Sequence, residues 1–202
     1  MIMLKKIPNI LTIGRIIIVP FFVLAFYLPG FYGDLTALIL FIIASFTDFL
    51  DGMLARMLGE ESKLGELLDP IADKIIVATA LILLVMDGTI RHYEVIAAII
   101  ILTREILISG LREFLAKGKI RLPVSNLAKL KTVLQMVSIA LLLSGETGNK
   151  LINFQDYNAQ TIGIILLWLS AALTLFTGYE YMRKELTTQF LKTIKIKLLF
   201  SF

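Results

Sequence analysis

This chain lacks cysteine and has very little histidine and charge. Its 202 residues include no cysteine and a single histidine, His92. A disulfide, a thiolate nucleophile and a cysteine metal site are therefore excluded, and one subunit cannot build a multi-histidine metal centre. Charged residues make up only 18% of the chain, whereas 57% are hydrophobic. Because a soluble domain is about 45–50% apolar, this composition indicates an integral membrane protein.

Six apolar segments are long enough to cross a bilayer, which takes about 20 mostly apolar residues in a helix. Turn-forming pairs at Pro29-Gly30, Asp87-Gly88 and Ser144-Gly145 separate several of them. The predicted fold is therefore an all-α integral membrane protein with six transmembrane helices, in a single domain over residues 1–202. The predicted spans are Ile10–Leu28, Leu35–Met57, Glu66–Met86, Tyr93–Leu115, Leu127–Ser144 and Thr161–Met182.

Basic residues gather in alternate connections, and short loops rich in lysine and arginine stay on the cytoplasmic side of a membrane. The predicted outer loops carry only Arg91 and Lys150. We therefore expect a multi-pass protein of the cytoplasmic membrane with both termini in the cytoplasm. Its net charge of +4 then reflects topology and anionic lipid rather than nucleic acid. The cytoplasmic basic residues are Lys5, Lys6, Arg56, Lys63, Lys117, Lys119, Arg121, Lys129, Lys131, Arg183, Lys184, Lys192, Lys195 and Lys197.

The C-terminal segment, residues 182–202, mixes lysine with phenylalanine, leucine and isoleucine. We interpret it as a basic amphipathic tail in the bilayer interface, the alternative being a frayed tail without a role. Its Thr193–Leu198 stretch alternates between polar and apolar residues instead of following a helical period.

Four aspartates interrupt the second and third predicted spans, two in each. Their three- and four-residue spacings place each pair on one helix face, and the short connection around Gly59–Leu64 makes the two helices antiparallel neighbours. Because a carboxylate within a span is costly, such residues indicate function by default. We therefore expect the acidic faces to meet in a polar cavity that opens to the cytoplasm. The aspartates are Asp48, Asp51, Asp69 and Asp73.

Divalent cations would offset the mutual repulsion of four neighbouring carboxylates. Oxygen ligands suit Mg²⁺, Mn²⁺ or Ca²⁺, and two-metal sites hold their ions about 3.5–4 Å apart. Gly52 and Ala55 leave room for a ligand, and Gly65 permits close backbone approach near a helix start. Arg56 offers a planar fork for phosphate, whereas Lys74 lies about 100° away from the face of the third-span aspartates. The pattern predicts metal-assisted phosphoryl chemistry, the alternative being acids that only pair with basic residues to hold the bundle.

Together these residues read D-x2-D-G-x2-A-R-x8-G-x3-D-x3-D over positions 48–73, which resembles the signature of the CDP-alcohol phosphotransferase family. Six further stretches are similar to the bacterial phosphatidylglycerophosphate synthases of that family: PNILTIGRI, TDFLDGMLAR, LGELLDPIADK, TREILISGLRE, AKLKTVLQM and TGYEY. Ala128 departs from the glycine expected before Lys129. The resemblance implies transfer of a phosphatidyl group from CDP-diacylglycerol to sn-glycerol 3-phosphate, which yields CMP and phosphatidylglycerophosphate.

The resemblance also implies a role for each signature position, and it implies a homodimer. Two Mg²⁺ or Mn²⁺ ions would be held by Asp48, Asp51, Asp69 and Asp73. The CDP pocket would be lined by Gly52, Ala55, Arg56 and Gly65. Asp73 would also act as the base that takes the proton from the acceptor hydroxyl, which then attacks the phosphorus next to diacylglycerol.

A phosphorylated acceptor needs cations beside the metals, and the fourth span contains two arginines. Arg104 and Arg112 are two helical turns apart and are predicted to line one stripe of that span. Inserting an arginine at the bilayer centre costs about 2.5–3.5 kcal/mol, so arginines without a structural or functional role are not expected there. The alternative is that they pair with Glu105 or Glu113, which would also orient the arginine forks.

Other basic residues are further candidates for the acceptor phosphate. Lys129 and Lys131 diverge by about 200° on one helix, so we expect at least one of them to contact phosphate. Ordinary loop charge is the alternative for these lysines. Arg15 is another candidate, with snorkelling to the membrane surface as its alternative. Tyr179 and Tyr181 are interpreted as part of an aromatic belt.

Other functions stay open at this point. The same family includes synthases that use another acceptor, such as inositol phosphate or phosphatidylglycerol, and the signature does not specify the acceptor. A divalent-cation transporter would also place acids within spans, but it should carry polar groups through the outer half of the bilayer as well. A structural scaffold would tolerate Asp69→Asn, which a catalytic site would not.

Overall fold

The structure is a computed structural model that describes residues 7–58, 63–117, 126–151, 153–154 and 157–199. Six long helices and one short helix, α6 (Gly145–Leu151), make up most of this part of the chain. Before the last helix, β1 (Asn153–Phe154) pairs antiparallel with β2 (Tyr157–Asn158) in a minimal hairpin. The long helices are α1 (Ile7–Phe26), α2 (Phe31–Leu58), α3 (Lys63–Met86), α4 (Glu94–Lys117), α5 (Asn126–Leu143) and α7 (Ala159–Leu199).

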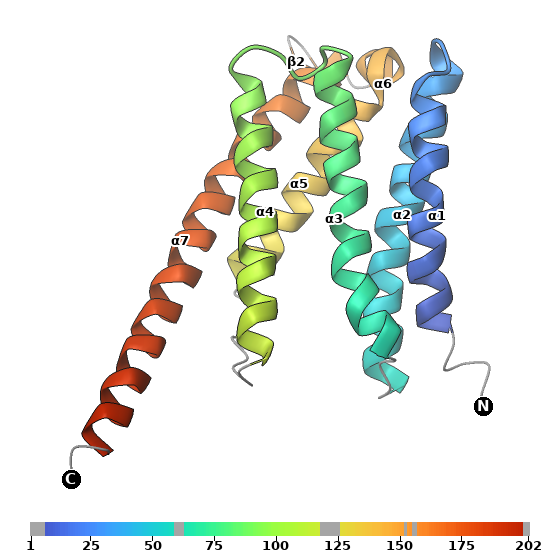
Figure 1. Ribbon diagram of the computed structural model, residues 1–202. Helices are drawn as coiled ribbons and strands as arrows, with labels where there is room; N and C mark the ends of the chain where they lie inside the picture. The colour runs from blue at the N-terminus through green and yellow to red at the C-terminus, as the bar shows by residue number, and fades with distance from the viewer. Residues whose placement is uncertain (1–6, 59–62, 118–125, 152, 155–156, 200–202) are drawn as a thin grey trace.

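The long helices alternate in direction, so both chain ends lie at one end of the bundle (Figure 1). The last turns of α2 and α4 and the first turns of α3 and α5 lie at that same end, whereas the hairpin and α6 lie at the other. Two turns at that other end need a left-handed backbone, and glycine supplies it at Gly30 (φ 67°) and Gly88 (φ 81°). The predicted breaks between the helices are therefore correct.

Three helices are long and apolar enough to cross a membrane within the part of the chain that the structure describes. The stretches that qualify are Phe31–Asp48 of α2, Asn126–Leu143 of α5 and Ala159–Arg183 of α7. The apolar part of α1, Ile10–Phe26, is shorter. Its outward side chains Phe21 and Leu24 are nevertheless exposed, as lipid-facing residues would be. The all-helical architecture is thus confirmed apart from the hairpin, whereas the number of six membrane crossings stays a prediction.

One hydrophobic core joins all six long helices. Each helix contributes at least one large side chain with almost no exposed surface: Phe22, Phe41, Leu81, Ile101, Ile139 and Leu167. Buried alanines, among them Ala44, Ala80 and Ala97, let the backbones approach closely. Ser138 on α5 donates a hydrogen bond of 2.7 Å to the carbonyl oxygen of Gly163 on α7. This contact ties the two most tilted helices of Figure 1 together.

The C-terminal segment is helical, because α7 continues without a break to Leu199. No glycine or proline lies between Arg183 and Leu199 to stop the helix. A helix satisfies its backbone hydrogen bonds internally, so the alternating side chains of residues 193–198 did not prevent it. Whether this extension lies in the bilayer interface stays a prediction.

The close approach of α5 and α7 at Gly163 predicts a loss of stability in Gly163→Ala. An added Cβ would lie 2.9 Å from Cγ and Cδ2 of Leu142, so a neighbour must shift, at a cost of about 1–3 kcal/mol. We expect a lower apparent melting temperature in detergent. The matched control is Gly110→Ala on α4, where nothing lies within 4 Å of the added atom. Equal melting temperatures for the two variants would contradict the close packing.

Candidate active site

A buried arginine of α1 brings together one aspartate from α2 and one from α3. Arg15 Nη1 donates to Asp48 Oδ1 at 2.7 Å, and the same nitrogen contacts Asp73 Oδ1. The Arg15 side chain has no exposed surface, whereas the side chains of Asp48 and Asp73 are 37% and 40% exposed. Two carboxylates therefore lie side by side and accessible, with an enclosed guanidinium behind them. Arg15 does not snorkel to the surface, so that alternative is wrong.

The three residues meet because they occupy matching levels on their helices. Arg15 lies eight residues from the start of α1, and Asp48 and Asp73 each lie ten residues from the helix end at the α2–α3 connection. At 1.5 Å per residue, all three are about 12–15 Å inside the end of the bundle that holds both chain ends. The expectation that the two acidic helix faces meet is thus confirmed for Asp48 and Asp73.

The other six signature residues belong to α2 and α3, but their side chains lie outside the described residues. The backbone places Asp51 one turn from Asp48 and Asp69 one turn from Asp73, each on the same helix face as its partner and nearer the α2–α3 connection. Gly52, Ala55, Arg56 and Gly65 follow in the same helices. Among the side chains that are described, no group of three or more acids or histidines lies together. The four-aspartate metal site therefore stays a prediction.

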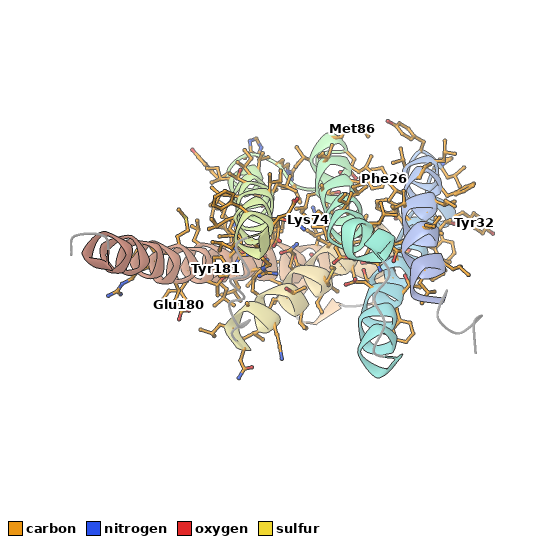
Figure 2. All side chains as sticks on the ribbon, turned by 60° about the horizontal axis from the view of Figure 1, so that its bottom comes forward. Phe26, Tyr32, Lys74, Met86, Glu180 and Tyr181 are labelled. Carbon is orange, nitrogen blue, oxygen red and sulfur yellow. The ribbon has the colours of Figure 1, made fainter. Side chains whose placement is uncertain are left out.

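A cluster of four cations lies beside the contact of Arg15 with Asp48 and Asp73, which we name the acidic junction. Lys74 is close enough to Asp73 and Arg112 to interact electrostatically with both, and Figure 2 shows it between α3 and α4. Lys131 on α5 interacts in the same way with Lys74 and Arg104, and Arg104 with Arg112. Three helices thus direct positive charge toward one region. We name Lys74, Arg104, Arg112 and Lys131 the cationic cluster.

Lys74 lies off the helix face that carries Asp69 and Asp73, so the spacing of the motif does not predict a role for it. That offset is what turns it toward α4 and α5 while Asp73, its neighbour in the chain, faces α1 and α2. The signal that could have identified it was its place within a predicted span, directly before the apolar run Ile75–Met86, since a charge there needs compensation.

Glu105 on α4 is the anion within this cluster. Its carboxylate pairs with Lys131 Nζ and lies 3.8 Å from Arg104 Nη1. Lys131 is only 3% exposed, whereas Lys129 is exposed. Lys131 is therefore the lysine of the pair that points inward. The alternative in which Arg104 pairs with Glu105 is therefore seen in the structure.

The TGYEY stretch of α7 holds the two arginines. Arg104 Nη2 donates to Thr177 Oγ1 at 3.2 Å, and its stem packs on Gly178, where an added Cβ would lie 3.2 Å from Arg104 Cγ. The guanidinium carbon of Arg112 lies 5.8 Å from the ring centroid of Tyr181, which is a cation–π distance. The interpretation of Tyr181 as part of an aromatic belt did not predict this contact with Arg112.

A cavity of about 130 Å³ opens at the opposite end of the bundle, by the α1–α2 turn and the start of α6. Its two acids have local contacts. Asp87 accepts hydrogen bonds of 2.9 Å from the backbone nitrogen and Oγ1 of Thr89, and the Asp34 carboxylate packs so closely on Gly145 that a Cβ would not fit there. This cavity is not the predicted one, and a polar cavity at the cytoplasmic end stays a prediction.

The chain belongs to the CDP-alcohol phosphatidyltransferase family, because the sequence model of that family matches residues 5–176. This result confirms the resemblance seen in the signature. Similar proteins include the CDP-diacylglycerol–glycerol-3-phosphate 3-phosphatidyltransferase of Rickettsia felis, 41% identical over 179 residues, which are 89% of this chain and 94% of that protein. The proteins of the same name from Cereibacter sphaeroides and Yersinia enterocolitica are each 38% identical, over 90% and 88% of this chain and 96% and 93% of theirs.

The ion pair between the buried Lys131 and the partly exposed Glu105 predicts a strong effect of Glu105→Gln on stability. Without the carboxylate, the Lys131 ammonium is left buried without its counter-ion, which costs about 3 kcal/mol. We expect a lower apparent melting temperature in detergent. The double variant Glu105→Gln with Lys131→Met should recover part of the loss, because it removes the buried charge. Losses that simply add in the double variant would contradict the pairing.

Proposed function

We propose that this protein transfers a phosphatidyl group from CDP-diacylglycerol to sn-glycerol 3-phosphate, giving phosphatidylglycerophosphate and CMP. The observation that carries this proposal is the pair of adjacent residues on α3: Asp73 meets Asp48 at Arg15, and Lys74 belongs to the cationic cluster. A transferase for this reaction needs both groups next to each other, one to bind metal and one to bind the acceptor phosphate. The printed names of the relatives support the same substrates.

Two divalent ions, Mg²⁺ or Mn²⁺, would be held by Asp48, Asp51, Asp69 and Asp73. Asp48 and Asp73 fit such ions because their carboxylates are hard oxygen donors that lie side by side and remain accessible. When bound, the ions would supply positive charge that stabilises the phosphate oxygens during transfer.

The chain's own residues would bind the nucleotide and move the proton. Gly52 and Ala55 on α2 and Gly65 on α3 leave space for the CDP group, and Arg56 would pair with its phosphates. Asp73 would accept the proton of the acceptor hydroxyl. The acceptor oxygen then forms a bond to the phosphorus that carries diacylglycerol, and the bond from that phosphorus to CMP breaks, so CMP leaves with the electron pair.

Glycerol 3-phosphate is a dianion, and the cationic cluster offers it a formal charge of the opposite sign. Arg104 and Arg112 present planar forks that suit phosphate oxygens, and Thr177 and Tyr181 restrain them. Lys131 and Lys74 add compact charges from α5 and α3. Lys129, the remaining acceptor residue predicted from the sequence, is exposed and is the weakest candidate.

We further propose that all six long helices cross the cytoplasmic membrane, with the acidic junction in a polar cavity on the cytoplasmic side and with both termini in the cytoplasm. The alternation of the six helices supports this arrangement, since the start of α1 and the end of α7 point to the same end of the bundle (Figure 1). A lipid substrate could enter from the bilayer and a soluble dianion from the cytoplasm. A homodimer, which the family resemblance implies, belongs to the same proposal.

Asp73→Asn tests the reaction directly. Purified protein in detergent is given CDP-diacylglycerol, sn-glycerol 3-phosphate and Mg²⁺, and both CMP release and the lipid product are measured. The variant should be slower by about 100-fold or more, because it loses a general base and a metal ligand. The matched control is Asp87→Asn at the opposite end of the bundle, which should keep wild-type activity.

Two outcomes would contradict the proposal in different ways. Release of CMP only with inositol phosphate, phosphatidylglycerol or another alcohol would retain the family chemistry and change the acceptor. Folded protein that releases no CMP with any acceptor would exclude the transferase, and divalent-cation transport would be measured next.

Lys131→Met tests the acceptor site, with Lys129→Met as a matched control two residues away. A lost charge-assisted hydrogen bond is worth about 1.5–3 kcal/mol, so KM for glycerol 3-phosphate should rise by about tenfold or more in Lys131→Met. KM for CDP-diacylglycerol should change little in either variant. A larger rise of KM for glycerol 3-phosphate in Lys129→Met than in Lys131→Met would show that Lys129, and not Lys131, binds the acceptor phosphate.

A further inference from the structure

Arg15 is the most completely buried charged side chain that the structure describes, with no exposed side-chain surface. A buried guanidinium is tolerated only when its partners offset the cost of removing it from water. Both aspartates that it contacts are distant in the chain, 33 and 58 residues away. Arg15 therefore links three helices at one point.

We propose that Arg15 is a positioning residue of the metal site, which it serves by fixing one oxygen of Asp48 and one of Asp73. This inference rests on the proposed function, since it takes both aspartates as metal ligands. The contacts use Oδ1 of each carboxylate. Each contact restricts the rotation of a carboxylate that the proposed function takes as a metal ligand.

The charges at this point explain why a positioning residue is needed. Asp48 and Asp73 come from different helices, and two adjacent carboxylates repel each other when no cation is bound. The Arg15 guanidinium holds them together before a metal arrives. Residues that orient metal ligands in this way typically change metal affinity by 10–100-fold when they are replaced.

Replacing Arg15 can either weaken or strengthen metal binding, depending on its role. The direction of the change in metal affinity therefore tests the proposal. A fixed positive charge repels a divalent cation, so a residue that merely occupied the empty site would weaken metal binding. Replacing such a residue would strengthen binding. A positioning residue has the reverse effect, because its loss lets the two ligands separate.

The experiment measures Mn²⁺ binding to purified protein in detergent by electron paramagnetic resonance, without substrates. The variants are Arg15→Gln, which removes the charge, and Arg15→Lys, which keeps the charge without the planar fork. Arg91→Gln is the matched control, because Arg91 is an exposed arginine at the opposite end of the bundle. Circular dichroism checks that each variant is folded.

We expect the Mn²⁺ dissociation constant to rise by about 10–100-fold in Arg15→Gln, by less in Arg15→Lys and not at all in Arg91→Gln, with the number of bound ions unchanged. If Arg15→Gln does not fold, Arg15→Lys decides, and a wild-type dissociation constant in that variant overturns the inference. Tighter binding, or fewer sites at the wild-type dissociation constant, overturns it as well. Wild-type protein that binds no Mn²⁺ contradicts the proposed metal site itself, which is a separate failure.

Discussion

Charges buried in an apolar bundle must compensate one another, and the inner surface of this protein is organised by that constraint. The burial of Arg15 is tolerated because Asp48 and Asp73 accept its hydrogen bonds. Lys131 is enclosed because Glu105 pairs with it. Each of these pairs joins different helices, so the same contacts that make the charges tolerable also set how α1, α2, α3, α4 and α5 are placed.

The polar interior divides into two regions of opposite character at a single point on α3. Asp73 faces the helices that precede it in the chain, and Lys74 faces those that follow. An α-helix turns by about 100° per residue, so two adjacent residues can serve two neighbouring sites. For the proposed reaction between a metal-bound nucleotide lipid and a phosphorylated alcohol, this geometry would place the metal site and the acceptor site on adjacent faces of α3.

The last helix supports this interior by packing as well as by polar contacts. Gly163 lets α7 approach α5, and Gly178 leaves room for the stem of Arg104. Tyr181 and Thr177 then hold the two arginines of α4. The mixture of small, hydroxyl and aromatic residues in α7 thus has a physical role that its high overall hydrophobicity conceals.

Sequence alone determined the approximate positions of the six long helices, the family and the acidic motif, because apolar length, turn residues and helical spacing are local properties of the chain. It did not determine the end of α7, which continues to Leu199. It could not assign Arg15, since snorkelling and burial depend on what lies beside α1. It likewise missed Lys74 and the Arg112–Tyr181 contact, and it could not choose between Lys129 and Lys131. Those outcomes depend on residues far apart in the chain, and only the packing of the helices brings such residues together.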